Sequence, residues 1–283
     1  MNELVELCRR CSLEEFSQSG GGNISVKDGN RLYIKASGVS LSDVTISSGY
    51  SIVDNLLVMS SLNEEVESDL MAFVLGDCAR PSLEVYFHSF LKKYVVHLHP
   101  TALNSILCSK QPVVNMIPYC KPGVVLSKKI FEQYSGQSII YLQNHGVILH
   151  ADTYQEIMKL IKDEHLKYIQ EWSTNLLEFW SLQDRFPDDF IYKIPYEDFR
   201  NWHETLKTPI QNITPDITLF LHDSIIITEN ALYIRAQSKQ KSLNIMEVLR
   251  GYCRSVHTSM HSLTEKDVSE ILDWEVEKYR KNL

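Results

Sequence analysis

The stretch "KYVVHLHPTALNS", residues 93–105, is an apolar strand pattern that ends on two histidines followed by a proline. Side chains at positions i and i+2 of a strand point to the same face of a sheet. His97 and His99 therefore project together, while Val96 and Leu98 project into the opposite layer. The pattern directs two imidazoles to one point. Taken alone, it is equally compatible with two polar side chains at a strand end that contact only backbone or water.

The composition is that of an ordinary soluble globular protein. With 283 residues, 44% hydrophobic and 23% charged, the chain has room for one large domain or for a domain with an appendage. A net charge of −8 and a pI of about 5.7 argue against a general nucleic-acid-binding protein, which is usually basic. No apolar stretch approaches the roughly 20 residues of a membrane span, and "MNELVELCRRCSLEEF" carries acids where a signal peptide has bases. We therefore expect a cytoplasmic protein with neither a membrane nor a nucleic acid as partner.

Six cysteines are spread through the chain without the density of a disulfide framework, so we expect them to be reduced. Cys8 and Cys11 have the C-x-x-C spacing, and the two arginines between them could lower a thiol pKa. A zinc site needs a second such pair, however, and a redox site usually follows a strand. We interpret this pair as packing residues of the first helix.

Strand and helix patterns alternate along the chain. "SGGGNISVKDGNRLYIKASG", residues 19–38, predicts two strands joined by a turn at residues 27–30. "SIIYLQNHGVILHA", residues 138–151, predicts a second strand pair that is interrupted at residues 144–146. The remaining patterns predict short strands within 45–61, helices over 2–17, 81–94, 101–108, 124–134 and 153–182, a C-terminal hairpin within 216–236, and helices over 242–253 and 271–283.

These elements favour a fold of the α/β class. Hairpin connections between several strands predict a mixed, largely antiparallel sheet covered by helices. "QDRFPDDF", residues 183–190, has the composition of a linker. We therefore divide the chain into a main domain at 1–185 and a small C-terminal α+β extension at 186–283.

A third histidine can join the pair on the strand. His145 stands at a strand end, where Gly146 lets the backbone turn tightly. Three neutral imidazoles leave one position of a zinc ion open for water or substrate, which is the geometry of a catalytic site. Glu84, on the helix predicted before the histidine strand, can hold such a metal or transfer a proton. His88, one turn further along, can orient Glu84 or simply bond to backbone or water, and the sequence leaves both open.

Two glycine-bearing turns, "GGGN" and "KASG", can form an anion site from backbone N–H groups. Such turns also occur at hairpin ends that bind no ligand, so the pattern alone leaves this open. The polar residues in or beside these turns, with a serine at the start of a predicted helix, are Asn23, Ser25, Lys35, Ser37, Gly38 and Ser82.

Five motifs in this order, "GGGNIS", "IKASG", "PSLEVYFH", "VVHLHP" and "QNHGVI", resemble the class II aldolase/adducin-head family, which includes fuculose-1-phosphate and rhamnulose-1-phosphate aldolases. The resemblance covers about residues 1–182 and implies a three-layer α/β/α fold. It also implies zinc, or another divalent transition metal, on His97, His99 and His145, with Glu84 as the catalytic carboxylate. A homotetramer with active sites near the subunit boundaries is a further expectation from the resemblance.

The same resemblance implies that the phosphate of the substrate binds at Asn23, Ser37, Gly38 and Ser82. The implied activity is that of a zinc-dependent aldolase that cleaves or forms a ketose 1-phosphate, with dihydroxyacetone phosphate and an aldehyde as products. The enediolate formed on cleavage would lie beside the dication, and Glu84 would carry the proton. Leu83 stands where many relatives have a second serine, and the tyrosine of the fuculose enzyme has no clear counterpart here. The ketose, the aldehyde and the proton-donating acid are therefore left unassigned.

Two other functions stay open. A sugar-phosphate epimerase, dehydratase or decarboxylase would use the same zinc, although epimerases of the family tend to carry aspartate in place of Glu84. A non-enzymatic interaction module like the adducin head would have lost the metal ligands, whereas the three histidines and Glu84 are present here. "ITPDITLF", "NIMEVLRGY" and "ILDWEVEKYRK" resemble the segment that follows the aldolase module in bifunctional aldolase/dehydrogenase chains, and we assign no catalytic residue to it.

Overall fold

The chain divides into two compact units, Met1–Gln170 and Glu171–Leu283, and each is described by itself. Within the first unit, none of the described helices has the length and apolar character that crossing a bilayer requires, and the same holds for those of the second. The computed structural model describes residues 1–13, 15–62, 69–108, 115–168, 173–194, 202, 206, 221, 224–228, 231–255, 264–266 and 268–269.

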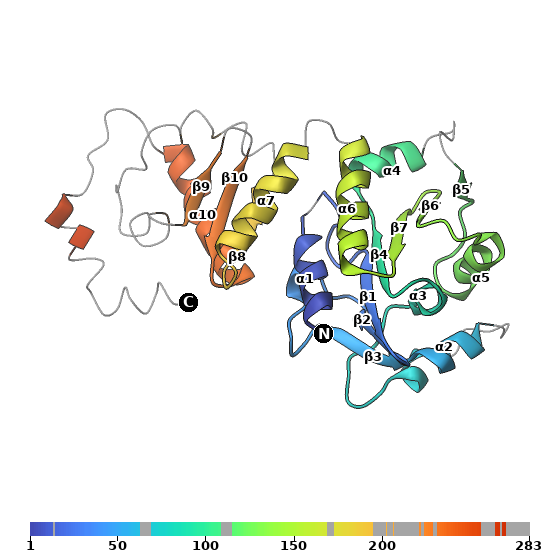
Figure 1. Cartoon of the computed structure of the whole chain (residues 1–283). Coiled ribbons are helices and arrows are strands. Elements are labelled where there is room, and N and C mark those ends of the chain that lie inside the picture. The colour runs from blue at the N-terminus through green and yellow to red at the C-terminus, as the bar shows by residue number, and fades with distance from the viewer. Residues whose placement is uncertain are drawn as a thin grey trace. The chain divides into compact units, whose positions relative to one another are not determined.

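A seven-stranded sheet forms the centre of the first unit, in the order β3-β2-β1-β4-β7-β6-β5 (Figure 1). Neighbouring strands pair antiparallel except β5 and β6, which pair parallel, so the prediction of a mixed, largely antiparallel sheet is confirmed. The predicted hairpin is β1–β2, and the predicted strand pair is β6–β7. The strands are β1 (Asn23–Asp28), β2 (Arg31–Lys35), β3 (Tyr50–Asp54), β4 (Tyr94–Leu98), β5 (Met116–Ile117), β6 (Ile139–Leu142) and β7 (Gly146–Ala151).

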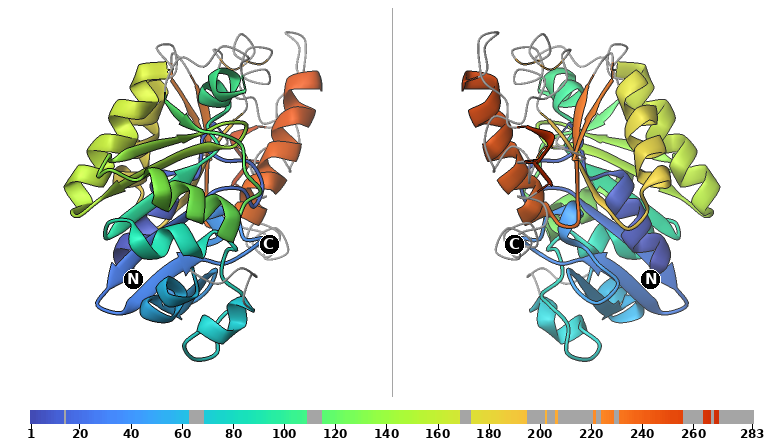
Figure 2. Two further views of the ribbon diagram at one scale, coloured as in Figure 1. Left: turned by 90° about the vertical axis from the view of Figure 1, so that its right-hand side faces the viewer. Right: turned by 90° about the vertical axis from the view of Figure 1, so that its left-hand side faces the viewer.

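Helices cover both faces of this sheet, which confirms the three-layer α/β/α fold. On one face α1 contacts β1, and α6 contacts β4 and β7. The left view of Figure 2 looks onto α5 and α3, which lie on the other face together with α2. The helices are α1 (Asn2–Arg10), α2 (Asn55–Ser61), α3 (Val85–Phe90), α4 (Thr101–Leu107), α5 (Val124–Gln133) and α6 (Tyr154–Tyr168), with short 3-10 turns at Leu41–Asp43 and Leu70–Phe73.

Strand β4 lies between β1 and β7 and is buried along its whole length. Its Val95 packs with Phe87 of α3 and Ile130 of α5 in one apolar core. Because side chains alternate along a strand, His97 faces the same layer as Val95. The ring of His97 contacts Phe87 edge-on, with 5.6 Å between the ring centroids. The face of the strand that carries His97 is therefore fixed by packing against α3 and α5.

Three predicted elements differ from the structure in type or in bounds. Helix α1 ends at Arg10 rather than at residue 17, because the chain returns to β4, where Phe16 accepts a hydrogen bond from the backbone of His99 (2.9 Å). The segment 45–61 holds β3 and then α2 rather than short strands, and the side chain of Asp54 caps α2. Helix α3 begins only at Val85, so Glu84 precedes the helix instead of lying within it.

The second unit contains a three-stranded antiparallel sheet in the order β8-β10-β9. The predicted hairpin is present as β9–β10, and the predicted helix is α10, which packs on β10 and β8. Helix α7 belongs to this unit, where Phe179 stacks on Tyr233, so the division falls before α7 rather than at residue 185. The helix predicted over 271–283 lies outside the described residues. The elements are α7 (Ser173–Arg185), β8 (Phe190–Lys193), β9 (Ile225–Ile227), β10 (Leu232–Ala236) and α10 (Lys239–Ser255).

Candidate active site

The three histidines named from the sequence come together at one end of the central strands. His97 lies on β4, His99 follows its end, and His145 lies in the turn between β6 and β7. Strands β4 and β7 pair antiparallel with Leu98 opposite Val147, so the end of β4 meets the start of β7. One ligand atom from each imidazole lies within 4.8 Å of the other two. The sequence prediction that these rings converge is therefore confirmed.

Gly146 makes this convergence possible. A Cβ atom on Gly146 would lie 2.2 Å from the carbonyl oxygen of Leu98 and 2.9 Å from Cδ2 of His99. Both distances are far below van der Waals contact, so no other residue fits without separating the strands. The glycine lets β7 approach β4 closely, between the residues that carry two of the rings.

Hydrogen bonding fixes the tautomer of His97. Its Nδ1–H donates to the carbonyl oxygen of Val147 (3.0 Å), which leaves Nε2 with a free lone pair. That Nε2 lies 3.0 Å from Nε2 of His99. In His145, the buried Nδ1 has no hydrogen-bond partner. Each ring thus has a nitrogen that can offer a lone pair to the common centre.

Burial keeps the three imidazoles neutral. It holds the pKa of His97 well below its usual value, and the neighbouring His99 adds to this shift. Burial also lowers the pKa of His99 and, with His97 close by, lowers the pKa of His145 to about 3. Neutral imidazole is the form that binds a metal ion. The rings are therefore ready to act as ligands across the physiological pH range.

Glu84 lies beside two of these rings. Its Oε2 is 3.5 Å from Nε2 of His97, and its Oε1 is 3.4 Å from Nε2 of His145. The side chain is buried, and Oε1 has no hydrogen-bond partner. Ligands of a tetrahedral zinc ion lie roughly 3.3 Å from one another, since each is about 2.0–2.1 Å from the metal. Three neutral imidazoles whose ligand atoms lie within 4.8 Å of one another, with an orphaned carboxylate oxygen beside them, make a donor set that suits a divalent transition metal.

The residues named for a phosphate site also come together, at the start of β1. The backbone N–H of Ser37 donates to the carbonyl oxygen of Arg80 (2.9 Å), so the turn after β2 lies against the segment that leads to Ser82. Asn23 reaches Ser82 from β1, with 3.1 Å between Nδ2 and Oγ. Gly38 has a φ of 74°, and both it and Ser37 are exposed. These four residues thus share one region, next to Glu84.

Lys35 joins the two glycine-bearing turns. Its Nζ donates to the carbonyl oxygens of Gly20 (3.1 Å), Ala36 (3.3 Å) and Val39 (2.6 Å), which uses the three donors of an ammonium group. The side chain is 2% exposed, and burial lowers its pKa. The sequence placed Lys35 beside the turns but assigned it no role in joining them. A lysine within a buried strand, next to a glycine turn, was the signal that could have shown its role.

His88 is bound to side chains rather than to backbone or water. Its Nδ1 is 2.7 Å from Oγ of Ser25, and its Nε2 contacts Oδ1 of Asn23. Asn23 in turn donates from Nδ2 to Oε2 of Glu84 (2.7 Å). Of the two possibilities that the sequence left open, contact toward Glu84 is the one present. The partners on β1 could not be found from helix spacing.

Another fully buried histidine lies apart from this site, toward the far end of β7. His150 contacts the ring of Tyr134 at 5.5 Å between ring centroids. Burial lowers its pKa to about 4, and the backbone of Gln137 and then the charges of Lys92, Lys27 and Asp152 act on it more weakly. Among the contacts of the described residues, none joins His150 to the three converging histidines. It serves below as a matched control for His88.

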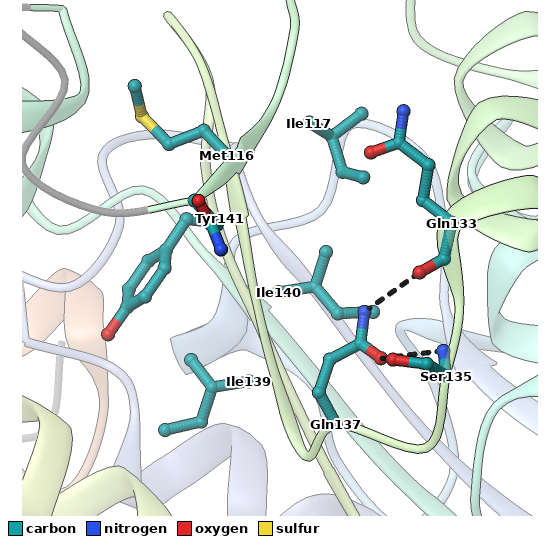
Figure 3. A pocket seen from close by; sticks show the side chains of 9 residues that line it. Met116, Ile117, Gln133, Ser135, Gln137, Ile139, Ile140 and Tyr141 are labelled. Carbon is teal, nitrogen blue, oxygen red and sulfur yellow. Dashed lines mark hydrogen bonds between the residues drawn. The ribbon is translucent and has the colours of Figure 1, made fainter.

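A pocket of about 570 Å³ lies at the β5–β6 edge of the sheet (Figure 3). None of the converging histidines lines it, and the hydroxyl of Tyr141 is bonded to Glu164. Gln137 spans its rim, where it accepts from the backbone of Ser135 (2.8 Å) and donates to that of Gln133 (3.4 Å). The pocket therefore holds no group for the predicted chemistry. It is lined by Asn115, Met116, Ile117, Gln133, Ser135, Gln137, Ile139, Ile140 and Tyr141.

The six cysteines are free. Cys8 and Cys11 are fully buried, and burial raises the pKa of Cys8 to about 12 and raises that of Cys11 as well. Such thiols stay protonated and unreactive at neutral pH. This agrees with the interpretation of the C-x-x-C pair as packing residues.

The chain is similar to several solved structures. The chain is similar to the N-terminal class II aldolase domain of a conserved protein from Thermoplasma acidophilum, with 26% identity, a TM-score of 0.52, and coverage of 62% of this chain and 92% of that one. It is also similar to an L-fuculose 1-phosphate aldolase (18% identity, TM-score 0.46, 73% and 95% covered). A third similar structure is YgbL from Klebsiella pneumoniae, a candidate aldolase, epimerase or decarboxylase (18%, 0.44, 65% and 89%).

No curated protein matches the chain. The sequence profile of the class II aldolase and adducin N-terminal domain, in contrast, matches residues 2–163, which is more than half of the chain. The match includes the histidines, Glu84 and both glycine-bearing turns. The chain therefore belongs to the family of class II aldolases and adducin N-terminal domains.

Proposed function

We propose that this protein is a zinc-dependent aldolase that cleaves a ketose 1-phosphate to dihydroxyacetone phosphate and an aldehyde, or forms the ketose in the reverse direction. One observation carries the proposal: the carboxylate of Glu84 lies 3.4–3.5 Å from Nε2 of two of the three converging histidines. An adducin-like interaction module has no need of this arrangement. An enzyme that transfers a proton beside a metal ion needs a carboxylate at such a position.

The three histidines would hold the ion, with Nε2 of His97 aimed by the hydrogen bond from Nδ1 to Val147. A bound zinc ion would polarise the ketone carbonyl and neutralise the charge that develops on its oxygen. Burial of His97 and Glu84 excludes water from this side of the site and strengthens these electrostatic interactions.

Glu84 would transfer the proton. In cleavage, the hydroxyl on the carbon that becomes the aldehyde gives its proton to a base that is left unassigned, the electron pair of the broken carbon–carbon bond goes to the carbon next to the ketone, and protonated Glu84 delivers a proton there. In synthesis, Glu84 removes that proton. Oε1 is suited to this task because it has no hydrogen-bond partner. Oε2, in contrast, accepts a hydrogen bond from Asn23.

The phosphate of the substrate would bind against the turn that contains Ser37 and Gly38. Backbone N–H groups of a glycine turn favour an anion, and the hydroxyl of Ser82 lies in the same region. The ammonium of Lys35 behind the turn adds a positive charge. Such a site would bind a phosphorylated ketose in preference to the free sugar.

The proposal is tested by incubating the zinc-loaded protein with dihydroxyacetone phosphate in deuterated water. We expect deuterium to enter the carbon next to the ketone, as detected by proton NMR, whatever the natural aldehyde is. A Glu84→Gln variant should bind zinc but lose this exchange by at least about a hundredfold. Full exchange in that variant would refute the role of Glu84.

Absence of exchange in the zinc-loaded wild type would refute the aldolase proposal. The epimerase, dehydratase and decarboxylase reactions would then be assayed on phosphorylated ketoses with the same protein. A preparation that binds no divalent metal would instead point to an interaction module. Metal analysis of the purified protein separates this outcome from the others.

A further inference from the structure

The amide of Asn23 has both of its hydrogens committed. Nδ2 donates to Oε2 of Glu84 (2.7 Å) and to Oγ of Ser82 (3.1 Å). A side-chain amide has two N–H groups, so none is left for a further acceptor while these bonds persist. The free part of the amide is its oxygen, Oδ1, which can only accept.

This arrangement determines the proton positions on His88. Since Oδ1 of Asn23 accepts, Nε2 of His88 must be the donor and carry the hydrogen. In a neutral imidazole the other nitrogen is then an acceptor. The hydroxyl of Ser25 lies 2.7 Å from Nδ1 and therefore donates to it. His88 thus has the opposite tautomer to His97, whose Nδ1–H donates to Val147.

The result is a chain of hydrogen bonds that runs one way, from Ser25 to His88 to Asn23 to Glu84. Ser25 and Asn23 are two apart on β1 and share a face, while His88 lies in α3, which begins directly after Glu84. All four side chains are buried, and those of Ser25 and His88 have no exposed surface. These hydrogen bonds therefore fasten the start of α3 to β1, at the position where Asn23 of β1 pairs with His97 of β4.

We propose that His88, supported by Ser25, is a positioning residue that acts through Asn23 to fix the carboxylate of Glu84. The chain holds Oε2 and leaves Oε1 facing His145, so it selects the oxygen that transfers the proton. Asn23 in this arrangement donates to the carboxylate of Glu84 and to Ser82, and it has no N–H group left for the phosphate of a substrate. The inference rests on the proposed function for the proton transfer, while the hydrogen-bond chain itself stands on the structure.

Two variants of His88 test this chain of hydrogen bonds. His88→Phe keeps a flat ring in the core but removes both hydrogen bonds, whereas the amide of His88→Gln can still donate to Asn23. With dihydroxyacetone phosphate in deuterated water, we expect His88→Phe to lower the maximal exchange rate by about ten- to a hundredfold. The half-saturating concentration and the zinc content should change by less than about threefold, because the histidine ligands and the phosphate turn are untouched. His88→Gln should recover most of the rate.

His150→Phe is the matched control. It also replaces a fully buried histidine of the same unit, but one outside the chain of hydrogen bonds. The exchange rate of this variant should therefore stay within about twofold of wild type. A wild-type exchange rate in His88→Phe would overturn the positioning role. An equal loss of rate in His150→Phe, or loss of zinc in His88→Phe, would also overturn it, because the effect would then be a general one on the core.

A second measurement needs neither metal nor activity. In metal-free protein with 15N-labelled histidine, the pattern of couplings between ring protons and nitrogens reports each tautomer, and the His88→Phe spectrum identifies the His88 signals. We expect the Nε2–H form for His88 and the Nδ1–H form for His97. The Nδ1–H form for His88 would overturn the chain whatever the enzyme does. If the wild type shows no exchange but His88 has the Nε2–H form, the aldolase proposal fails and the chain of hydrogen bonds stands.

Discussion

Replacing Gly146 with alanine should damage the metal site more than it damages the fold. The added Cβ would lie 2.2 Å from the carbonyl oxygen of Leu98, whereas real Cβ atoms essentially never come closer than 3.0 Å. Strands β4 and β7 must therefore separate locally by about 0.8 Å, or His99 must rotate away from the new methyl group. Overpacking of this kind typically costs about 1–3 kcal/mol of unfolding free energy.

The effect on metal binding follows from the same displacement. Ligand distances in a metal site are tolerated within about 0.2 Å, and the displaced segment carries His99 and adjoins His145. We therefore expect the zinc affinity of Gly146→Ala to fall by about ten- to a hundredfold. Competition with a colorimetric chelator measures this affinity, and urea unfolding of the metal-free protein measures the stability.

Gly136→Ala is the control for this prediction. Gly136 has a φ of 94°, and a Cβ there would meet no atom within 4 Å, so alanine costs backbone strain of about 1–3 kcal/mol without a clash. It lies in the connection between α5 and β6, away from the three histidines. We expect this variant to lose stability and to keep its zinc affinity. An unchanged zinc affinity in Gly146→Ala, or an equal loss in Gly136→Ala, would show that the close approach of the strands does not set the site.

Other predictions concern three buried features of the first unit. Lys35→Met should raise the half-saturating concentration of dihydroxyacetone phosphate by at least about tenfold while zinc stays bound, because the two turns lose the ammonium that joins them; equal half-saturating concentrations in exchange kinetics would contradict this. Folded His150 has a pKa of about 4 against an ordinary 6.5, so between these values the unfolded chain binds the extra proton and stability falls as the pH falls. Urea unfolding should therefore show wild type losing roughly 1–2 kcal/mol more than His150→Phe from about pH 7 to pH 5, and parallel curves would contradict it. Cys8 and Cys11 should react with iodoacetamide at least about a hundredfold more slowly in the folded protein than in urea, as mass spectrometry would show, and fast labelling of the folded chain would count against buried, protonated thiols.

Those parts of the site that depend on local periodicity could be predicted from the sequence. The two-residue period of a strand places His97 and His99 on one face, and Gly146 marks a backbone that turns beside His145. The β1–β2 hairpin and the β6–β7 pair are likewise local, since each turn lies between the strands that it joins. For these elements the neighbouring residues in the sequence are also the neighbours in space.

The contacts that orient Glu84 arise from segments far apart in the sequence. Asn23 and Glu84 are 61 residues apart, and Ser25 and His88 are 63 apart. Periodicity fixes which face a side chain occupies, but which faces meet depends on how α3 packs on β1. The starts and ends of helices shifted for the same reason, because α3 begins after Glu84 where its preceding segment is bound to the turn at Ser37. Local patterns therefore predicted which histidines converge, and the packing of distant segments oriented Glu84 beside them.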